Sequence, residues 1–171
     1  KVVLAIEDDR NIPAETANAV QKLISQNKVV AVVGSVASKC TLAGAPIAQA
    51  AKVPMISPTS TNEAVTKVGD YIFRACFIDP FQGTVMAKFA YTKLNARNAA
   101  MLYDIGNDYT KGLAENFKKA FEALGGKIVA SETYGVGESD FSAQLTKIRS
   151  ARPDVLFLPD YYNSVGLQAR Q

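Results

Sequence analysis

The sequence predicts an α/β protein built on parallel sheets, and three observations lead to this fold class. Short apolar runs rich in β-branched residues alternate with longer segments whose apolar residues recur at helical spacing. This alternation of strand and helix is typical of parallel sheets joined by right-handed crossovers. The composition is that of a globular protein, with 48% hydrophobic and 20% charged residues.

The strands are expected where Val and Ile are concentrated. KVVLAI, at residues 1–6, is almost continuously apolar and predicts a buried strand. Pro54 stands at the start of a later strand, which suggests an edge or entry position because proline cannot donate to a hydrogen-bond ladder. The other predicted strands cover residues 29–33, 53–56, 71–76, 98–103, 127–134 and 154–158.

Helices are expected between these strands. Pro13 suits the start of the first helix, where its missing N–H would have no partner anyway. Gly125-Gly126 is a stop signal for a later helix, and Asp140 is an N-cap candidate for the next. The predicted helices cover residues 13–26, 39–51, 62–66, 80–94, 109–124 and 140–150, followed by a loop at 161–163 and a final, unfinished helix.

The pattern changes once, near Phe77–Pro80, where a proline ends a strand and a new helix begins. Four predicted strands precede this point and three follow it, so neither block forms a complete doubly wound sheet. We therefore expect two incomplete Rossmann-like (flavodoxin-like) lobes, residues 1–78 and 79–171, joined by a short hinge. Because the chain begins in a strand-like run and ends in a helix-like one, we expect a processed or truncated piece of a longer protein.

Charge and composition exclude several function classes. The formal net charge is +3, but acidic residues are interspersed and no basic stripe suggests nucleic acid. The chain has no histidine, which removes the commonest general base and metal ligand. No apolar run reaches the length of a membrane span. Cys40 and Cys76 permit one disulfide without demanding it, and two buried thiols are the simpler interpretation.

Two loops of the same kind lie between residues 34 and 62. The first runs from Gly34 to Ser38 and the second from Ser57 to Asn62, and both are rich in hydroxyls and small residues. Each follows a strand, so both should lie at the carboxyl edge of a parallel sheet, where such sheets bind small ligands. Free N–H groups at the start of a following helix attract an anion such as a carboxylate or phosphate.

The residue types in these loops favour a carboxylate. Ser38, Thr59 and Thr61, with adjacent amides, offer the donors that a carboxylate accepts. Loops of the second lobe offer Tyr109 and Tyr161-Tyr162. If the two edges face each other, these rings would cover an apolar stem.

Asp79, at the junction of the lobes, could meet an ammonium group. A ligand with a carboxylate, an ammonium and a small side chain is an α-amino acid.

Simpler interpretations stay open. Ser and Thr after strands are common helix caps, and the paired tyrosines are compatible with surface packing. Glu7-Asp8-Asp9 is compatible with an Mg²⁺-dependent phosphoryl-accepting site like that of a response-regulator receiver. The later strands lack the aspartate and lysine that such a site needs. Residues 34–38 also lack the pattern of a phosphate-binding loop.

Five segments together carry a resemblance to a known family. In order, they are EDDRNIPAETANAVQKLI, VVAVVGSVASKCTLAGAPIAQAAKVPMISPTSTN, YIFRACFIDPFQGTVMAKFA, DIGNDYTKGLAENFKKAFEALGGKIV and DFSAQLTKIRSARPDVLFLPDYYN. The chain resembles the periplasmic solute-binding proteins of branched-chain amino acid ABC transporters, which have the type I periplasmic-binding fold. The same fold occurs in sensors of amides and amino acids, so a sensor or regulator domain is the alternative.

The resemblance implies roles for individual residues. Ser38 and Thr61 correspond to residues that bind the ligand carboxylate, and Thr59 to one whose carbonyl meets the ammonium. Asp79 corresponds to a crossover acid that contacts the ammonium in some relatives. The remaining implied pocket residues are Ala37 and Ser60 on the first lobe and Tyr109 and Tyr161 on the opposing lobe.

The resemblance also implies a non-enzymatic protein without cofactor or metal. It would capture a small, branched-chain amino acid between lobes that close like a hinged clamp, and deliver it to an ABC permease in the membrane. The implied location is periplasmic or extracellular, and a cell-surface lipoprotein is one such form. Relative to the family, the first lobe lacks its first strand and helix, and the second lobe is partial. An open sheet of this kind favours self-association.

Overall fold

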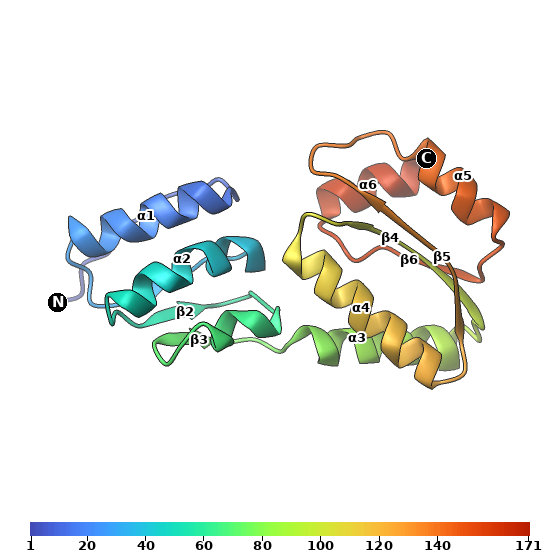
Figure 1. Ribbon diagram of the computed structural model, residues 1–171, viewed down its shortest axis with the longest axis horizontal. Coiled ribbons are helices and arrows are strands. Elements are labelled where there is room, and N and C mark those ends of the chain that lie inside the picture. The colour runs from blue at the N-terminus through green and yellow to red at the C-terminus, as the bar shows by residue number, and fades with distance from the viewer. The chain divides into compact units, whose positions relative to one another are not determined.

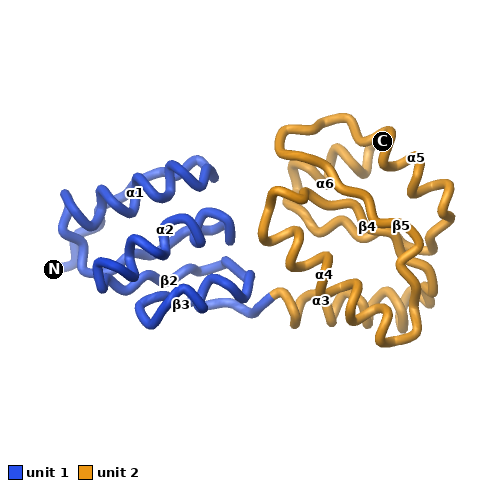
Figure 2. The backbone as a smooth tube through the Cα atoms, in the orientation of Figure 1, with its two compact units in different colours: residues 1–78 blue, residues 79–171 orange.

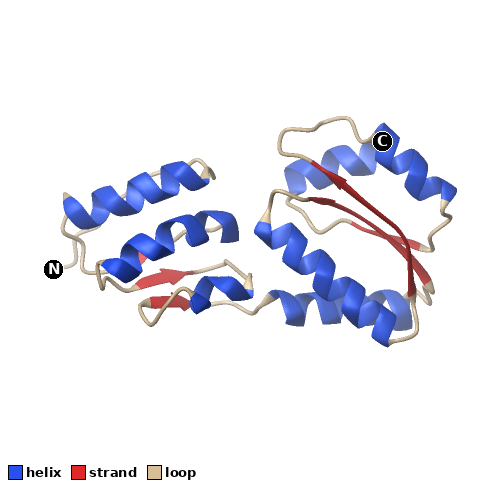
Figure 3. Cartoon of the chain, viewed as in Figure 1, coloured by secondary structure: helices blue, strands red, loops and turns tan.

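The computed structural model describes residues 1–171 and forms two compact units, Lys1–Ile78 and Asp79–Gln171 (Figure 2). Each unit combines helices with a three-stranded parallel sheet, which confirms the predicted α/β class (Figure 3). The elements are, in order, α1 (Pro13–Ser25), β1 (Val32–Val33), α2 (Ser38–Ala50), β2 (Met55–Ser57), η1 (Glu63–Lys67), β3 (Ile72–Arg74), α3 (Asp79–Lys88), η2 (Phe89–Lys93), β4 (Asn98–Asp104), α4 (Asp108–Ala123), β5 (Lys127–Tyr134), α5 (Ser142–Ser150), β6 (Val155–Phe157) and α6 (Tyr162–Arg170) (Figure 1).

The first unit has its strands in the order β1-β2-β3. Met55 occupies the centre of this sheet, opposite Val32 on one side and Ile72 on the other. Its buried side chain belongs to a core that includes Val20 of α1 and Ala45 of α2. The helices therefore pack on the sheet largely through small and β-branched residues, which allow close approach.

The second unit has the strand order β5-β4-β6, so β4 is central. Successive β4 side chains point to opposite faces of the sheet. Ala99 and Met101 pack with Phe117 and Phe121 of α4, whereas Ala100 and Leu102 pack on the face that holds Phe141 and Ile148. All four of these β4 residues are buried, so the strand carries two cores.

The predicted strand at residues 1–6 is wrong. This segment has no regular structure, and its apolar side chains (Val2, Val3, Leu4 and Ile6) are 79–87% exposed. A strand gains its stability from neighbours in a sheet, and no strand pairs with this segment. An apolar, β-branched run alone therefore does not make a strand.

Two smaller expectations also change. The predicted loop at residues 161–163 is shorter, because α6 already begins at Tyr162. Phe141, and not Asp140, is the N-cap residue of α5, although the Asp140 carboxylate accepts a hydrogen bond from the Ser142 N–H at 3.0 Å. The Asp140 side chain thus still serves the start of this helix from one position earlier.

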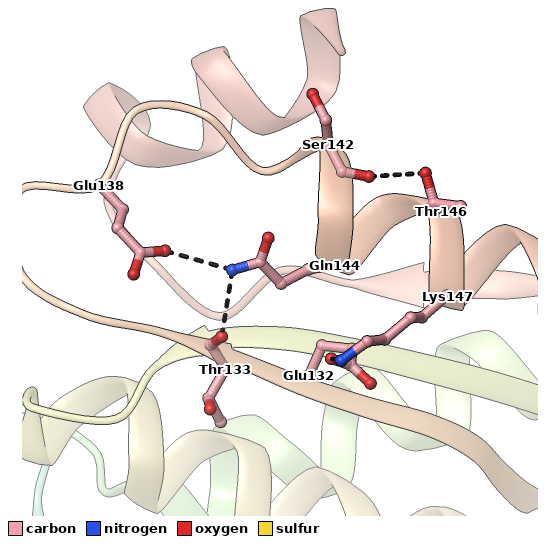
Figure 4. Close-up of polar contacts among 7 residues, drawn as sticks. All are labelled: Glu132, Thr133, Glu138, Ser142, Gln144, Thr146 and Lys147. Atoms are coloured by element: carbon pink, nitrogen blue, oxygen red, sulfur yellow. Dashed lines mark hydrogen bonds and ion pairs between the residues drawn. The ribbon is translucent and has the colours of Figure 1, made fainter.

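Polar contacts join the outer strand β5 to α5 (Figure 4). Lys147 Nζ lies 3.0 Å from Glu132 Oε2, and Gln144 Nε2 donates to the Thr133 carbonyl at 3.4 Å and to Glu138 at 3.2 Å. Exposed ion pairs contribute at most about 1 kcal/mol, so these contacts orient the helix more than they stabilise the fold.

None of the helices is both long and apolar enough to span a bilayer.

Helices α3 and α4 of the second unit approach each other closely at Gly83. A Cβ added there would lie 2.7 Å from the Phe117 backbone nitrogen. We therefore expect Gly83→Ala to lower the free energy of unfolding by about 1–3 kcal/mol, because the α4 backbone cannot easily move. Urea unfolding followed by circular dichroism measures this change.

Gly166 in α6 is the matched control. An added Cβ at Gly166 meets nothing within 4 Å. Gly166→Ala should therefore raise stability by about 0.5–1 kcal/mol through helix propensity alone. Equal effects of the two substitutions would contradict the assigned α3–α4 contact.

Candidate ligand-binding site

The two hydroxyl-rich loops start side by side at the carboxyl edge of the first sheet. β1 and β2 are paired parallel neighbours, with Val33 opposite Ile56. The Gly34 N–H donates to the Ile56 carbonyl at 3.0 Å, which extends the pairing into the first loop. The loops between β1 and α2 and between β2 and η1 are therefore held at one edge.

Hydroxyl groups of the second loop bind carbonyl groups of the first. Ser57 Oγ donates to the Ser35 carbonyl at 2.7 Å, and Thr59 Oγ1 donates to the Val36 carbonyl at 2.9 Å. Ser60 Oγ lies 3.2 Å and 3.1 Å from the same two carbonyl oxygens. These three hydroxyls hold the loops together, so Thr59 and Ser60 offer a ligand mainly their backbone groups.

Thr41 of α2 also belongs to this hydrogen-bond network between the loops. Its side chain is fully buried, and its Oγ1 accepts a hydrogen bond from the Ser35 N–H at 3.0 Å. The same oxygen lies 2.8 Å from Ser60 Oγ. Thr41 was not predicted as a site residue, because inside a helical segment its hydroxyl gives no signal in the sequence.

Arg74, at the end of β3, orients the backbone of the second loop. Its guanidinium donates to the Ser60 carbonyl at 3.1 Å and to the Asn62 carbonyl at 2.6 Å. In a planar trans peptide the C=O and the next N–H point in opposite directions. The Thr61 N–H is therefore turned away from Arg74, toward the opposite side of the loop.

The hydroxyl groups of Thr61 and Ser38 have hydrogen-bonding capacity that is not fully used. Thr61 is 6% exposed, and its Oγ1 is buried without a hydrogen-bond partner. Ser38 is 1% exposed, and its Oγ accepts from the Asn62 N–H at 3.3 Å while keeping its own hydrogen to donate. A buried hydroxyl without a partner costs about 1–3 kcal/mol, so a native protein that keeps one is expected to use it.

The start of α2 lies at the same place. Its N-cap is Ala37, a buried residue without a side-chain acceptor, so no side chain caps the first N–H groups of the helix. Helix N-termini attract anions through these groups and through the helix dipole. Ser38, Thr61 and the first turn of α2, which we call the carboxylate site, thus form a set of donors suited to a carboxylate.

Asp9 anchors this region, a role that the sequence did not predict. Its carboxylate accepts hydrogen bonds from Ser35 Oγ, from the Asn11 N–H at 2.9 Å and from Thr16 Oγ1 at 3.1 Å. Burial acts to raise the pKa of this carboxyl, but the hydrogen bonds from Ser35, Asn11 and Thr16 outweigh it and lower the pKa. Asp9 is therefore an ionised acceptor that fixes the first loop, and the structure has no acidic cluster able to hold a metal ion.

The second unit brings two predicted aromatic residues together. The rings of Tyr109 and Tyr161 stack with centroids 5.3 Å apart and planes inclined by 24°. Gln82 Nε2 donates to the Tyr109 hydroxyl at 3.3 Å. Burial raises the pKa of Tyr109, and the negative charges of Asp79 and Asp160 raise it further. Tyr109 therefore keeps its proton at neutral pH, and the charges of two carboxylates act on it.

The predicted site residues therefore fall into two groups. Ala37, Ser38, Thr59, Ser60 and Thr61 lie together in the first unit. Asp79, Tyr109 and Tyr161 belong to the second unit, where Asp79 is 1% exposed. Tyr162, which the sequence also suggested, is 91% exposed as the first residue of α6 and is not part of the stacked pair.

The chain is similar to proteins of a known family. A family model described as periplasmic binding protein matches residues 1–166 of the chain. The chain belongs to this family. A Leu/Ile/Val-binding protein of Rhizobium johnstonii is 34% identical over the whole chain, which spans 46% of that relative. The chain thus covers about half the length of the curated relatives it matches.

Two solved structures are also similar. A leucine-binding protein from Thermotoga maritima is 44% identical, with a TM-score of 0.92 over 96% of this chain and 47% of that one. A branched-chain amino acid transporter substrate-binding protein from Streptococcus pneumoniae, solved in complex with isoleucine, is 40% identical, with a TM-score of 0.87 and the same coverage. These likenesses confirm the predicted fold and family.

The lowered pKa of Asp9 predicts a pH-dependent contribution to stability. A carboxyl whose pKa is lower in the folded than in the unfolded state stabilises the fold above its unfolded pKa, about 3.9, and loses this effect as pH falls through the folded value. We expect Asp9→Asn to lower the free energy of unfolding by about 1 kcal/mol at neutral pH. The difference from wild type should shrink as the pH falls through the folded pKa of Asp9 and disappear once this carboxyl is protonated.

Urea unfolding at several pH values measures this effect. Asp8→Asn is the control, because Asp8 is exposed and accepts only the Arg10 N–H, at 2.9 Å. A deficit of Asp9→Asn that is constant with pH would show that the charge of Asp9 does not matter.

Proposed function

We propose that this chain binds a small α-amino acid with a branched, apolar side chain and contributes it to an ABC transporter outside the cytoplasm. Family membership supports a solute-binding role without catalysis. The similar structures and relatives include proteins described as binding leucine, isoleucine and valine. Under this proposal the partner is a membrane permease, and no cofactor is required.

The observation that carries the proposal is the buried, unpartnered hydroxyl of Thr61 in the carboxylate site. Most hydroxyls around it are consumed by contacts between the two loops, so this group is not simply one more link in the network. It lies on a loop whose neighbouring residue, Asn62, donates to Ser38 Oγ. N–H and O–H donors at the start of a helix suit a carboxylate, which accepts up to about four hydrogen bonds.

The donors of the carboxylate site support an amino acid carboxylate over a phosphate as the ligand. Residues 34–38 lack the sequence pattern of a phosphate-binding loop, and Arg74 is occupied by backbone carbonyls and by Thr66 Oγ1 at 2.7 Å. A singly charged carboxylate needs no further cation when N–H and O–H donors surround it.

The test is isothermal titration calorimetry of the chain with leucine, isoleucine, valine and alanine. Thr61→Val keeps the shape of the side chain and removes only the hydroxyl. We expect this change to weaken leucine binding at least about tenfold, because it deletes one charge-assisted donor. The free protein should be as stable as wild type or up to about 1 kcal/mol more stable, because an unsatisfied buried group is gone.

Thr41→Val is the matched control. It makes the same chemical change at a hydroxyl that is fully used inside the loop network. We expect it to lower the free energy of unfolding by about 1–3 kcal/mol. If Thr61→Val binds leucine as tightly as wild type, the carboxylate site is wrong.

A further inference from the structure

A groove lies on the surface of the second unit, between the neighbouring helices α3 and α4 (Figure 1). Its volume is about 370 Å³, which falls within the usual size of small-molecule sites, roughly 300–1,000 Å³. Pro80, Thr84 and Lys88 form its α3 side. These residues are spaced by four positions, so they lie on one face of the helix.

Small side chains create this groove. Gly83 brings the two helices into contact, since a Cβ added there would lie 2.7 Å from the Phe117 backbone nitrogen. Beside this contact, α4 lines the groove with Ala120, Ala123 and its C-cap residue Leu124. Alanine side chains are too short to fill the space between the helices, so the groove stays open above an apolar floor.

Two lysines, one from each helix, give the groove a positive charge. Lys88 and Lys119 both line it and are exposed, and none of the three ion pairs in the structure includes either of them. Glu115 and Glu122 lie within about one turn of Lys119 on α4, yet neither is paired with it or lines the groove. The groove therefore combines an apolar floor with two positive charges and no negative one.

We infer that this groove binds a small organic anion with an apolar tail, of the class of medium-chain carboxylates. The tail would lie on the alanine and leucine side chains, and the carboxylate would meet the ammonium groups of Lys88 and Lys119. Lysine suits this arrangement, because its stem packs on apolar surface while its charged end stays in water. The inference is independent of amino acid binding, since none of the residues predicted to bind the amino acid lines the groove.

A second groove, between α1 and α2 of the first unit, provides the comparison. Its volume is about 490 Å³, and Ile24, Ile47 and Ala50 are among the residues that line it. No charged residue lines this groove, so it resembles the first in its apolar surface but offers no attraction to an anion. Substitutions there serve as matched controls.

The test begins with titration calorimetry of the full chain with octanoate, 1-octanol and acetate at low ionic strength. Octanoate has both an apolar tail and a charge, whereas each of the other two compounds has only one of these features. We expect saturable binding of octanoate at one site, roughly tenfold tighter than binding of 1-octanol, because two exposed ion pairs are lost with the charge. Acetate should bind more weakly still, since each buried CH₂ group contributes up to about fourfold.

Substitution of the lysines tests the charge. Lys88→Gln and Lys119→Gln should each weaken octanoate binding about two- to fivefold, and the double variant roughly tenfold, with 1-octanol unchanged. Lys118→Gln is the control, because Lys118 is an exposed lysine of α4 that does not line the groove. Equal binding of octanoate and 1-octanol, or equal losses in the three single variants, would overturn the inference.

Substitution of the floor tests the location. Ala123→Leu places a longer side chain in the groove at an exposed position and keeps both lysines. It should weaken octanoate binding by about fourfold or more, the effect of at least one buried CH₂ group. Ala50→Leu makes the same change in the groove between α1 and α2 and should leave octanoate binding unchanged.

Leucine and Thr61→Val separate this inference from the proposed function. Saturating leucine should not displace octanoate, and Thr61→Val should not change its affinity. Octanoate that competes with leucine or depends on Thr61 would occupy the carboxylate site, which overturns the present inference alone. Octanoate binding that depends on both lysines, in a protein that binds no leucine, supports the groove and contradicts the proposed function. Binding to phosphatidylglycerol vesicles without binding of free octanoate would assign this face to a membrane surface and overturn the inference.

Discussion

Three hydroxyl groups meet at the carbonyl oxygen of Ser35, and the shape of the first unit's binding edge depends on this meeting. Ser57, Thr41 and Ser60 approach that oxygen from the end of β2, from α2 and from the second loop, at 2.7, 3.1 and 3.2 Å. Strand pairing brings the loops to one edge, but only these contacts set their mutual position. Buried polar networks of this kind are rigid when every member is satisfied.

The rigidity of this network makes the unsatisfied hydroxyl of Thr61 informative. Around Thr61 nearly every polar atom has a partner, and Arg74 fixes the direction of the peptide groups on either side. A buried hydroxyl without a partner in such a setting is the group that the proposed ligand would satisfy. The loop network bears the cost of holding the donors in place, so less ordering is needed on binding.

The second unit differs from the first in the chemistry of its polar and aromatic side chains. Its contribution is an aromatic pair and carboxylates in place of hydroxyls and amides. The Tyr134 hydroxyl reaches from the end of β5 to the loop after β6, across the end of the central strand. One unit thus offers hydrogen-bond donors, and the other offers aromatic rings and carboxylates.

The sequence alone determined the fold class, nearly all helix and strand positions, and the two loops at the sheet edge, because these follow from local periodicity and from the order of elements. It also identified Ser38 and Thr61 as candidates, since hydroxyls after parallel strands are recognisable. The residue pattern could not distinguish Thr61 from Thr59, because both are hydroxyls in one loop and only their partners differ. Tertiary structure alone decided the contacts of Asp9, Thr41 and Arg74, which join residues distant in the chain. It also decided that residues 1–6 form no strand, because a strand exists only where a neighbour completes its hydrogen bonds.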